Sequence, residues 1–358
     1  MAENEHDFAL VVGINDYPNY GSNGRPLRGA IGDAEEFADW LLDAEFGGGL
    51  KPDHCKLIRS SVETVDPPQP QKYRIDAAFQ QIWNMSKGLG GGRRFYLYFS
   101  GHGQTQTHND VALCMANWEI NRQAAAISFR KYLDLVIRCM NFEEVVILMD
   151  CCRTRKVGAK GQESELTCPV PVAGEVRVFI AHATEFQTAA HEADLPGQDN
   201  EEAQEESDND EPIVRGHFTR ALITALKGAA ASDTGGVSAG KLASYLKKVV
   251  PRIASRSGHV QNPVFEIRGF LTGEDDELWF GSAPQVTSVE TTIHFRPDRI
   301  GPIRLEDPNL DIIRDGPPGA EPWEETLEMA RHLLTDLHTG EEMVLELNES
   351  TGEIDVEF

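Results

Sequence analysis

The sequence lacks the features by which several protein classes are recognised. No C-x-x-C pair occurs among its six cysteines, so neither a metal site nor a disulfide framework is predicted from Cys55, Cys114, Cys139, Cys151, Cys152 and Cys168. No apolar run reaches the ~18 residues that span a bilayer. Residues 1–13 have neither a basic region nor a small-residue cleavage site, which argues against a secretory signal and predicts a cytoplasmic protein.

Basic residues are also scarce, with 33 Lys and Arg against 58 Asp and Glu and a net charge of −25. Residues 193–212 hold nine acids and no base, and residues 271–358 hold 22 acids against five bases, so the rest of the chain is nearly neutral. This distribution argues against nucleic acid or an anionic membrane as a partner. It is compatible with a basic substrate, although a solvated surface explains each acidic stretch equally well.

Apolar runs alternate with helical patterns through most of the chain. Near-continuous apolar runs suit strands that are buried on both faces of a parallel sheet, and the alternation predicts an α/β sandwich. The predicted strands are residues 8–14, 55–60, 94–100, 144–150 and 176–183. The predicted helices are residues 33–46, 73–85, 128–140, 217–228 and 238–254, the last bent or ended near Pro251.

The pattern changes after about residue 282, where short alternating segments and turn residues begin. We therefore predict a main domain over residues 1–282 and a small mixed or mostly β domain over residues 283–358, in which residues 321–337 could form a helix. Within the main domain, residues 153–175 and the acidic loop 193–212 lack periodicity and are predicted connectors.

Two predicted strands end on reactive side chains. "RFYLYFSGHG" ends at His102 between two glycines, and "EVVILMDCCR" ends at Asp150, Cys151 and Cys152. If the strands are neighbours, an imidazole and a thiol meet at one sheet edge, where the imidazole can take the thiol proton. A glycine beside the histidine lets a backbone N–H approach a substrate carbonyl. Taken singly, the histidine is more often part of a turn and the cysteines are more often buried packing.

Together, "YFSGHG" and "MDCCR" resemble the histidine and cysteine motifs of caspase-like cysteine peptidases, in particular the metacaspase and bacterial orthocaspase branch. Further segments resemble the same family in the same order: "ALVVGINDY", "LRGAIGDAEEFADWL", "IAHATEFQTAAHE", "GHFTRALITAL" and "HVQNPVFE". The resemblance covers about residues 8–280. It implies the caspase–haemoglobinase three-layer sandwich with a mostly parallel central sheet.

The resemblance also assigns the reacting groups. His102 matches the catalytic histidine, and Cys152 matches the nucleophile because Asp150 stands two positions before it. Gly103 and the backbone N–H of Cys152 would form the oxyanion hole. Cys151 is interpreted as a packed neighbour.

Substrate specificity follows from the same resemblance. Asp33 and Asp150 match the two aspartates that accept Arg or Lys before the cut, and Ser100 matches a pocket-lining serine. A buried carboxylate pair needs a cation, and a guanidinium can bind it through two hydrogen bonds. Asp33 could instead only cap its helix. No cofactor is required, and calcium dependence stays open because no calcium-binding aspartate cluster matches.

The family also has a linker that is cut during maturation, which residues 153–175 match. Its basic residues are the candidate self-cleavage sites Arg153, Arg155, Lys156 and Lys160, and a loop that is never cut is the alternative. The sequence departs from the metacaspase His-Ser-Gly after the nucleophile.

We therefore expect a zymogen endopeptidase that cuts protein substrates after Arg, and less readily after Lys, in a bacterial-type cell-death or defence pathway. An activating protein could be a further partner. The alternatives are a catalytically silent partner-binding module and a caspase-like peptidase with non-basic specificity. A hydrolase or phosphate-binding fold is disfavoured, because neither G-x-S-x-G nor a phosphate loop is present.

Overall fold

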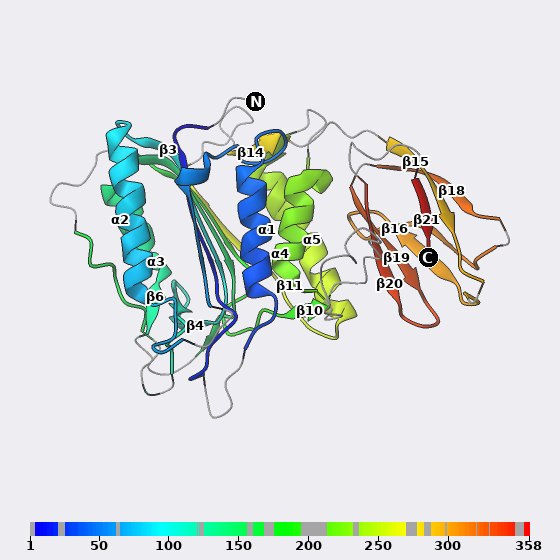
Figure 1. Cartoon of the computed structure of the whole chain (residues 1–358), viewed down its shortest axis with the longest axis horizontal. Helices are drawn as coiled ribbons and strands as arrows, with labels where there is room; N and C mark the ends of the chain where they lie inside the picture. Colours follow the sequence, from blue (N-terminus) through cyan, green and yellow to red (C-terminus); the bar gives the residue numbers. More distant parts are fainter. Residues whose placement is uncertain are drawn as a thin grey trace.

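The structure is a computed structural model of the chain (Figure 1). It describes all residues except 1–3, 21–25, 62–64, 120, 122–124, 156–159, 168–174, 195–212, 232–235, 270–277, 283–287, 298, 320, 329 and 348–353.

A six-stranded sheet lies at the centre of the main domain, with the strand order β13-β9-β7-β3-β1-β2. The strands are β1 (Asp7–Gly13), β2 (Cys55–Arg59), β3 (Gly92–Ser100), β7 (Phe142–Asp150), β9 (Arg177–His182) and β13 (Val264–Arg268). The first five run parallel, and β13 pairs antiparallel with β9 at one edge. All of β1 and almost all of β3 and β7 are buried, as their near-continuous apolar sequences predict.

Helices cover both faces of this sheet (Figure 1). One face carries α2 (Lys72–Gly88) and α3 (Phe129–Cys139), and the other carries α1 (Ala30–Leu42), α4 (His217–Thr224) and α5 (Ala239–Arg256). Short helical turns are η1 (Pro52–His54) and η2 (Ala225–Ala229). The five predicted helices are confirmed, but α5 continues through Pro251 rather than ending there.

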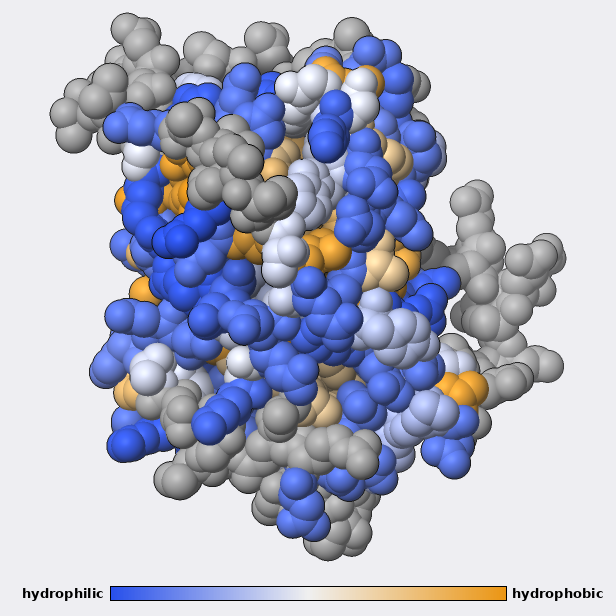
Figure 2. All heavy atoms as spheres, turned by 90° about the vertical axis from the view of Figure 1, so that its left-hand side faces the viewer, coloured by the Kyte–Doolittle hydropathy of each residue, from blue (hydrophilic) through white to orange (hydrophobic). Residues whose placement is uncertain are grey.

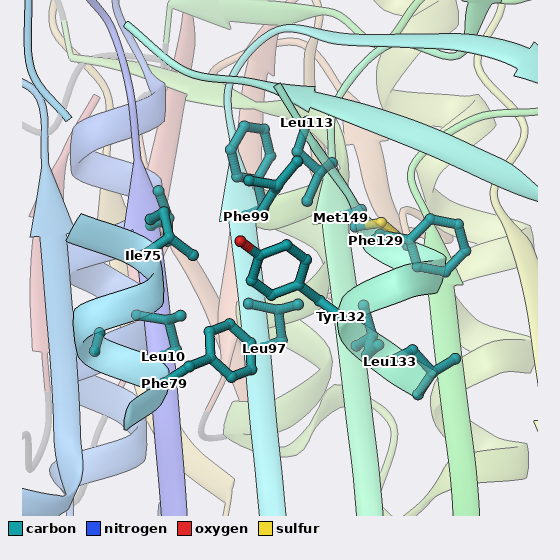
Figure 3. Packing of buried hydrophobic residues seen from close by; sticks show 14 of the residues in the cluster. Leu10, Ile75, Phe79, Leu97, Phe99, Leu113, Phe129, Tyr132, Leu133 and Met149 are labelled. Carbon is teal, nitrogen blue, oxygen red and sulfur yellow. The ribbon is translucent and has the colours of Figure 1, made fainter. Parts of the chain in front are cut away.

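Two cores fill the spaces between the layers. Phe79 and Tyr132 pack against Leu97 of the sheet on the α2 and α3 side (Figure 3). Phe37, Phe218 and other side chains of α1, α4 and α5 fill the opposite side. Apolar residues at helical spacing thus face the sheet from both sides, which completes the predicted three-layer α/β sandwich.

Short strands surround the carboxyl ends of β3 and β7. One four-stranded sheet contains β4 (Gly103–Thr107), β5 (Asp110–Cys114), β6 (Ala126–Ser128) and β8 (Thr154–Arg155). The pair β10 (Glu192–Asp194) and β11 (Val214–Gly216) brackets the acidic loop, of which residues 195–212 lie outside the described residues. At the opposite end of the sheet, a further pair joins β12 (Gly236–Ser238) to β14 (Trp279–Ser282), and the Trp279 carbonyl accepts from Arg94 near the start of β3 (Figure 1).

The C-terminal residues form strands around a core of their own. One sheet has the order β18-β15-β21 and the other β17-β16-β19-β20. The strands are β15 (Ser288–His294), β16 (Ile303–Glu306), β17 (Ile312–Gly316), β18 (Trp323–Glu328), β19 (Arg331–Asp336), β20 (Glu342–Glu346) and β21 (Ile354–Glu357). The predicted helix over residues 321–337 is therefore wrong, since β18 and β19 occupy that range.

The surface that carries α2 is mostly hydrophilic, with small hydrophobic patches (Figure 2). Such scattered apolar residues are usual on a folded domain. Among the described residues, no helix combines the length and apolar character that crossing a bilayer requires.

Candidate active site

The register of the central sheet brings the two reactive motifs together. β3 and β7 are neighbouring parallel strands, and their last residues, Ser100 and Asp150, are directly paired. His102 and Cys152 each follow two positions later, so both lie at the same sheet edge. They line one cleft of about 470 Å³ with Asp33, Ser100 and Asp150. The predicted site residues of these two motifs are therefore neighbours in space, at the place where α/β sheets bind ligands.

Aromatic side chains hold the histidine. The Tyr17 hydroxyl accepts a hydrogen bond from the His102 backbone N–H at 2.9 Å and donates one to the Cys114 carbonyl at 3.2 Å. The Tyr20 ring stacks on the imidazole with centroids 4.2 Å apart, and the Tyr17 ring lies at 4.6 Å. Trp118 packs behind Tyr20 at 4.5 Å. These contacts restrict both the backbone position and the ring plane of His102.

Cys152 lies beneath the loop that follows β9. Its Sγ is 3.5 Å from the Ala190 carbonyl oxygen, and the Ala190 N–H donates back to Sγ at 3.4 Å. Burial raises the pKa of the Cys152 thiol, while the Ala190 hydrogen bond opposes this and Asp150 adds to it. The resting group is therefore a protonated thiol. Cys151 is 3% exposed and packs in the core, as predicted.

Gly103 begins β4 beside Cys152. His102 O accepts from Cys114 N at 2.9 Å, and Gly103 pairs with Leu113. In an antiparallel ladder the residue after a hydrogen-bonded position turns its N–H away from the partner strand. A Cβ at Gly103 would clash with the Cys152 carbonyl and approach the Cys151 sulfur. Glycine is thus required for this close approach, which leaves the Gly103 N–H directed away from β5.

Asp33 is 1% exposed in the first turn of α1. Its carboxylate accepts from Ser100 Oγ at 3.0 Å and from the Gly216 N–H at 3.1 and 3.2 Å. The N-cap residue is Gly29, and Asn15 Oδ1 accepts from the Ile31 N–H in the first turn at 3.0 Å, so Asp33 contacts the cleft residues instead of capping. Burial raises the pKa of Asp33 well above its ordinary value, and the nearby Asp150 raises it further.

Asp150 is 6% exposed and accepts from both the backbone N–H and the hydroxyl of Thr219, at 3.0 and 2.7 Å. Burial raises the pKa of Asp150 to about 6, although the Thr219 hydrogen bonds lower it. A Cβ at Gly216 would clash with this carboxylate and approach Asp33. The two acids thus converge on Gly216, and each carries an energetic penalty for ionisation.

A third acid, Glu192, lines the same cleft. Its carboxylate accepts from the backbone N–H groups of Arg28 at 2.9 Å and Gly29 at 2.8 Å, at the N-terminus of α1. Asp194 pairs with the Arg28 side chain at 3.3 Å. The start of the acidic loop, at residues 193 and 194, therefore lies beside the cleft.

No metal site is apparent within the described part of the chain, where no three His, Cys, Asp or Glu side chains form a coordinating group.

The basic residues after Cys152 differ in accessibility. Arg153 is 5% exposed, and its guanidinium donates to the carbonyls of His108 at 2.8 Å and Thr184 at 3.5 Å. This placement argues against the predicted cleavage after Arg153, because a peptidase needs an accessible, extended segment. Arg155 and Lys160 are exposed, and Lys156 lies outside the described residues.

Several site residues were missed by sequence reasoning. Tyr17 lies in the segment "ALVVGINDY" and Thr219 lies in "GHFTRALITAL". Neither residue has a sequence spacing that indicates contact with His102 or Asp150. Tyr20 and Glu192 carried no such signal either, because their partners are distant along the chain. Only the three-dimensional arrangement brings them to the cleft.

Comparison with known proteins assigns the chain to a family. The caspase domain family matches residues 6–270, which is more than half of the chain. A probable protease from a Desulfuromonadales bacterium is 27% identical over 237 residues, covering 62% of this chain and 26% of that protein. The chain thus spans about a quarter of that relative. A crystal structure of a Geobacter sulfurreducens protein has a TM-score of 0.45 at 16% identity, covering 78% of this chain and 98% of that one.

The predicted resemblance is thereby confirmed, and with it the caspase fold of the main domain. The chain belongs to the caspase domain family of cysteine peptidases.

Proposed function

We propose that the protein is an endopeptidase that cuts after Arg, and less readily after Lys, with Cys152 as nucleophile and His102 as general base and acid. The observation that carries the proposal is the presence of two buried carboxylates, Asp33 and Asp150, in the cleft that also contains these two groups. A peptidase with this cleft would act on proteins with exposed basic sites.

In the proposed reaction, His102 accepts the thiol proton as Cys152 Sγ attacks the scissile carbonyl carbon. The N–H groups of Gly103 and Cys152 would donate hydrogen bonds to the oxyanion. The protonated imidazole then transfers its proton to the leaving amine as the C–N bond breaks, which leaves an acyl-thioester. Water, deprotonated by His102, attacks the thioester and releases the carboxylate product, and the thiol regains its proton.

Charge supports basic specificity. Asp33 and Asp150 have raised pKa values because they are buried near each other, so the empty pocket resists carrying two negative charges. A guanidinium would balance the pair with one of the two carboxyl groups still protonated, and it could donate two parallel hydrogen bonds, a geometry that an ammonium matches less well. The expected preference is therefore Arg over Lys, and an acidic residue should be rejected.

A weakly active zymogen is consistent with the resting geometry. Burial raises the pKa of the Cys152 thiol and so opposes formation of the thiolate, although the hydrogen bond from the Ala190 N–H acts the other way, and the Ala190 carbonyl oxygen lies 3.5 Å from Sγ. Movement of the loop around Ala190 would free Sγ. Arg155 and Lys160 are the accessible candidates for the maturing cut. A cytoplasmic role in cell death or defence, with a separate activating protein, remains part of the proposal.

Fluorogenic peptides that end in Arg, Lys or Asp before the dye test the function directly. We expect release from the Arg peptide, slower release from the Lys peptide, and none from the Asp peptide. Cys152→Ala should abolish release, and His102→Ala should reduce it by about 10²–10⁴-fold, the usual contribution of general acid–base catalysis.

The outcomes separate the alternatives. Cleavage after Asp but not Arg would overturn the specificity while leaving the dyad in place. Activity that survives Cys152→Ala would exclude the dyad. A protein that cleaves none of the peptides, before or after limited proteolysis to mimic maturation, would favour a silent partner-binding module.

A further inference from the structure

A separate cavity of about 230 Å³ lies between the peptidase domain and the C-terminal β domain. Its walls come from α4 and α5 on one side and from β19, β20 and the turn after β16 on the other. The domains are joined around it by polar contacts, including Tyr245 Oη to the Pro308 carbonyl at 2.5 Å and Lys248 to Asp311 at 2.7 Å. The proposed peptidase mechanism makes no use of this cavity.

Three arginines from three different elements line the cavity: Arg215, Arg220 and Arg331. Glu36 shares its two carboxylate oxygens between two of them, with Arg215 Nε at 3.3 Å and Arg331 Nη2 at 2.7 Å. One carboxylate thus serves two guanidinium groups, and nothing in this arrangement neutralises Arg220.

Arg220 is partly buried on α4, and among the described residues its guanidinium has no hydrogen bond or ion pair. Burial lowers the pKa of Arg220, and the positive charges of Arg256 and Arg331 lower it further. Glu342, whose carboxylate lies 4.0 Å from Arg256 Nη1, opposes this effect. A partly buried guanidinium without a hydrogen-bond acceptor is incompletely solvated, and an anion in the cavity would supply acceptors.

The remaining lining shows what kind of anion fits. Asp307 also faces the cavity, but its carboxylate accepts from the Asp311 N–H at 2.7 Å and from Asn309 at 3.3 Å within its own turn. Glu36 is thus bound to two other guanidiniums and Asp307 is bound within its own turn, and neither carboxylate accepts a hydrogen bond from Arg220 among the described residues. The other walls are apolar, formed by Ala221, Val249, Ile253, Leu333 and Val344 among others. A phosphate group can accept from several guanidiniums at once, and apolar walls suit a small organic body attached to it.

We propose that this interdomain cavity, with the unpartnered Arg220 beside Arg215 and Arg331, binds a small phosphomonoester. The phosphate contacts Arg220, and the organic part lies against the side chains of α5 and β20. The ligand contacts both domains and therefore strengthens their association.

Binding is tested on the full chain carrying Cys152→Ala, which excludes self-cleavage. Inorganic phosphate and phenyl phosphate are titrated by calorimetry and by thermal unfolding, with ionic strength held constant by chloride. We expect saturable binding of both, with phenyl phosphate at least as tight because the apolar walls accommodate its ring. Arg220→Gln should weaken binding at least about tenfold, as expected for loss of a charge-assisted hydrogen bond. Arg304→Gln is the matched control, since Arg304 pairs with Asp315 at 2.8 Å on the surface of the C-terminal domain.

The unfolding midpoint without ligand distinguishes a binding role from a structural one. Arg220→Gln removes an uncompensated charge, so the midpoint should stay the same or rise without phosphate and should no longer respond to phosphate. Equal losses of stability with and without phosphate would show that Arg220 is structural and would overturn the proposal, as would undiminished binding by the variant. Weaker binding of phenyl phosphate than of phosphate would overturn the ligand class. If Arg220→Gln does not fold, Arg220→Lys, which keeps the charge but loses the planar fork, should also bind phosphate more weakly.

Discussion

Replacing Asp150 with asparagine should stabilise the folded protein above pH 6, although it removes an ionisable group from the active site. Burial raises the pKa of Asp150 from 3.8 to about 6. At 1.36 kcal/mol per pKa unit, this shift corresponds to about 3 kcal/mol of destabilisation once the group is ionised in both the folded and the unfolded protein. Asparagine has nearly the same shape and can still accept the hydrogen bond of the Thr219 N–H. It also removes the charge that raises the pKa of Asp33.

The sign of the pH dependence follows from proton linkage. Because the folded pKa is raised, the folded protein holds its proton more tightly, and the stability from this group is lost as the pH rises from about 4 through about 6. The destabilisation that ionised Asp150 causes reaches about half of its full value at pH 5 and its full value above pH 7. The advantage of the variant should therefore grow by about 1.5 kcal/mol between pH 5 and pH 8. Any constant cost from altered Thr219 hydrogen bonds cancels in this difference.

Urea unfolding at pH 5, 6, 7 and 8 measures the effect, with Cys152→Ala as the common background. The buried His182 and His217 have lowered pKa values and titrate equally in both proteins, so the difference between the proteins reports Asp150 together with its effect on Asp33, which acts in the same direction. Asp311→Asn is the control, because Lys248 and Arg252 lower the pKa of that exposed carboxyl and its contribution is constant over this range. A difference for Asp150→Asn that is flat with pH, or that shrinks toward pH 8, would refute the reasoning.

Two further predictions concern maturation and the histidine. Incubated wild-type protein should yield fragments that begin after Arg155 or Lys160, whereas Cys152→Ala should stay whole in mass spectrometry; equal fragmentation of both proteins would contradict self-processing. Tyr17→Phe removes the hydroxyl that accepts from the His102 N–H, so we expect kcat to fall about tenfold with little change in KM and in the unfolding midpoint. An unchanged kcat would show that ring packing alone positions the imidazole.

The parallel sheet was predictable because its strands are buried on both faces. Such strands have near-continuous apolar sequences, which stand out from the amphipathic helices between them. Residues 321–337 were misread for the opposite reason. Trp323 and Leu327 are four apart, a spacing that places them on one face of a helix and equally on one face of a strand. The sequence period alone could not separate these two structures.

The proximity of His102 and Cys152 was predictable because each follows the end of a strand by two positions, and paired parallel strands end at a common edge. The residues that surround these two groups could not be predicted from the sequence. Ala190 reaches Cys152 through backbone atoms, which carry no residue-type signal. Glu192 is 163 residues from Gly29, so its position depends on how the loop after β9 crosses the molecule. Cleavage after Arg153 was proposed from charge alone, and burial of the guanidinium is a property of packing that charge does not reveal.

The short segment from Arg215 to Arg220 contacts both the cleft and the C-terminal β domain. Gly216 and Thr219 hold the two aspartates of the cleft, while Arg215 and Arg220 face the β domain. A peptidase trimmed after residue 282 would lose one wall of that cavity and leave both guanidiniums in water. Because the intervening residues belong to a single strand end and helix turn, measurements on such a truncated chain would report on an altered setting of Asp33 and Asp150 rather than on the native one.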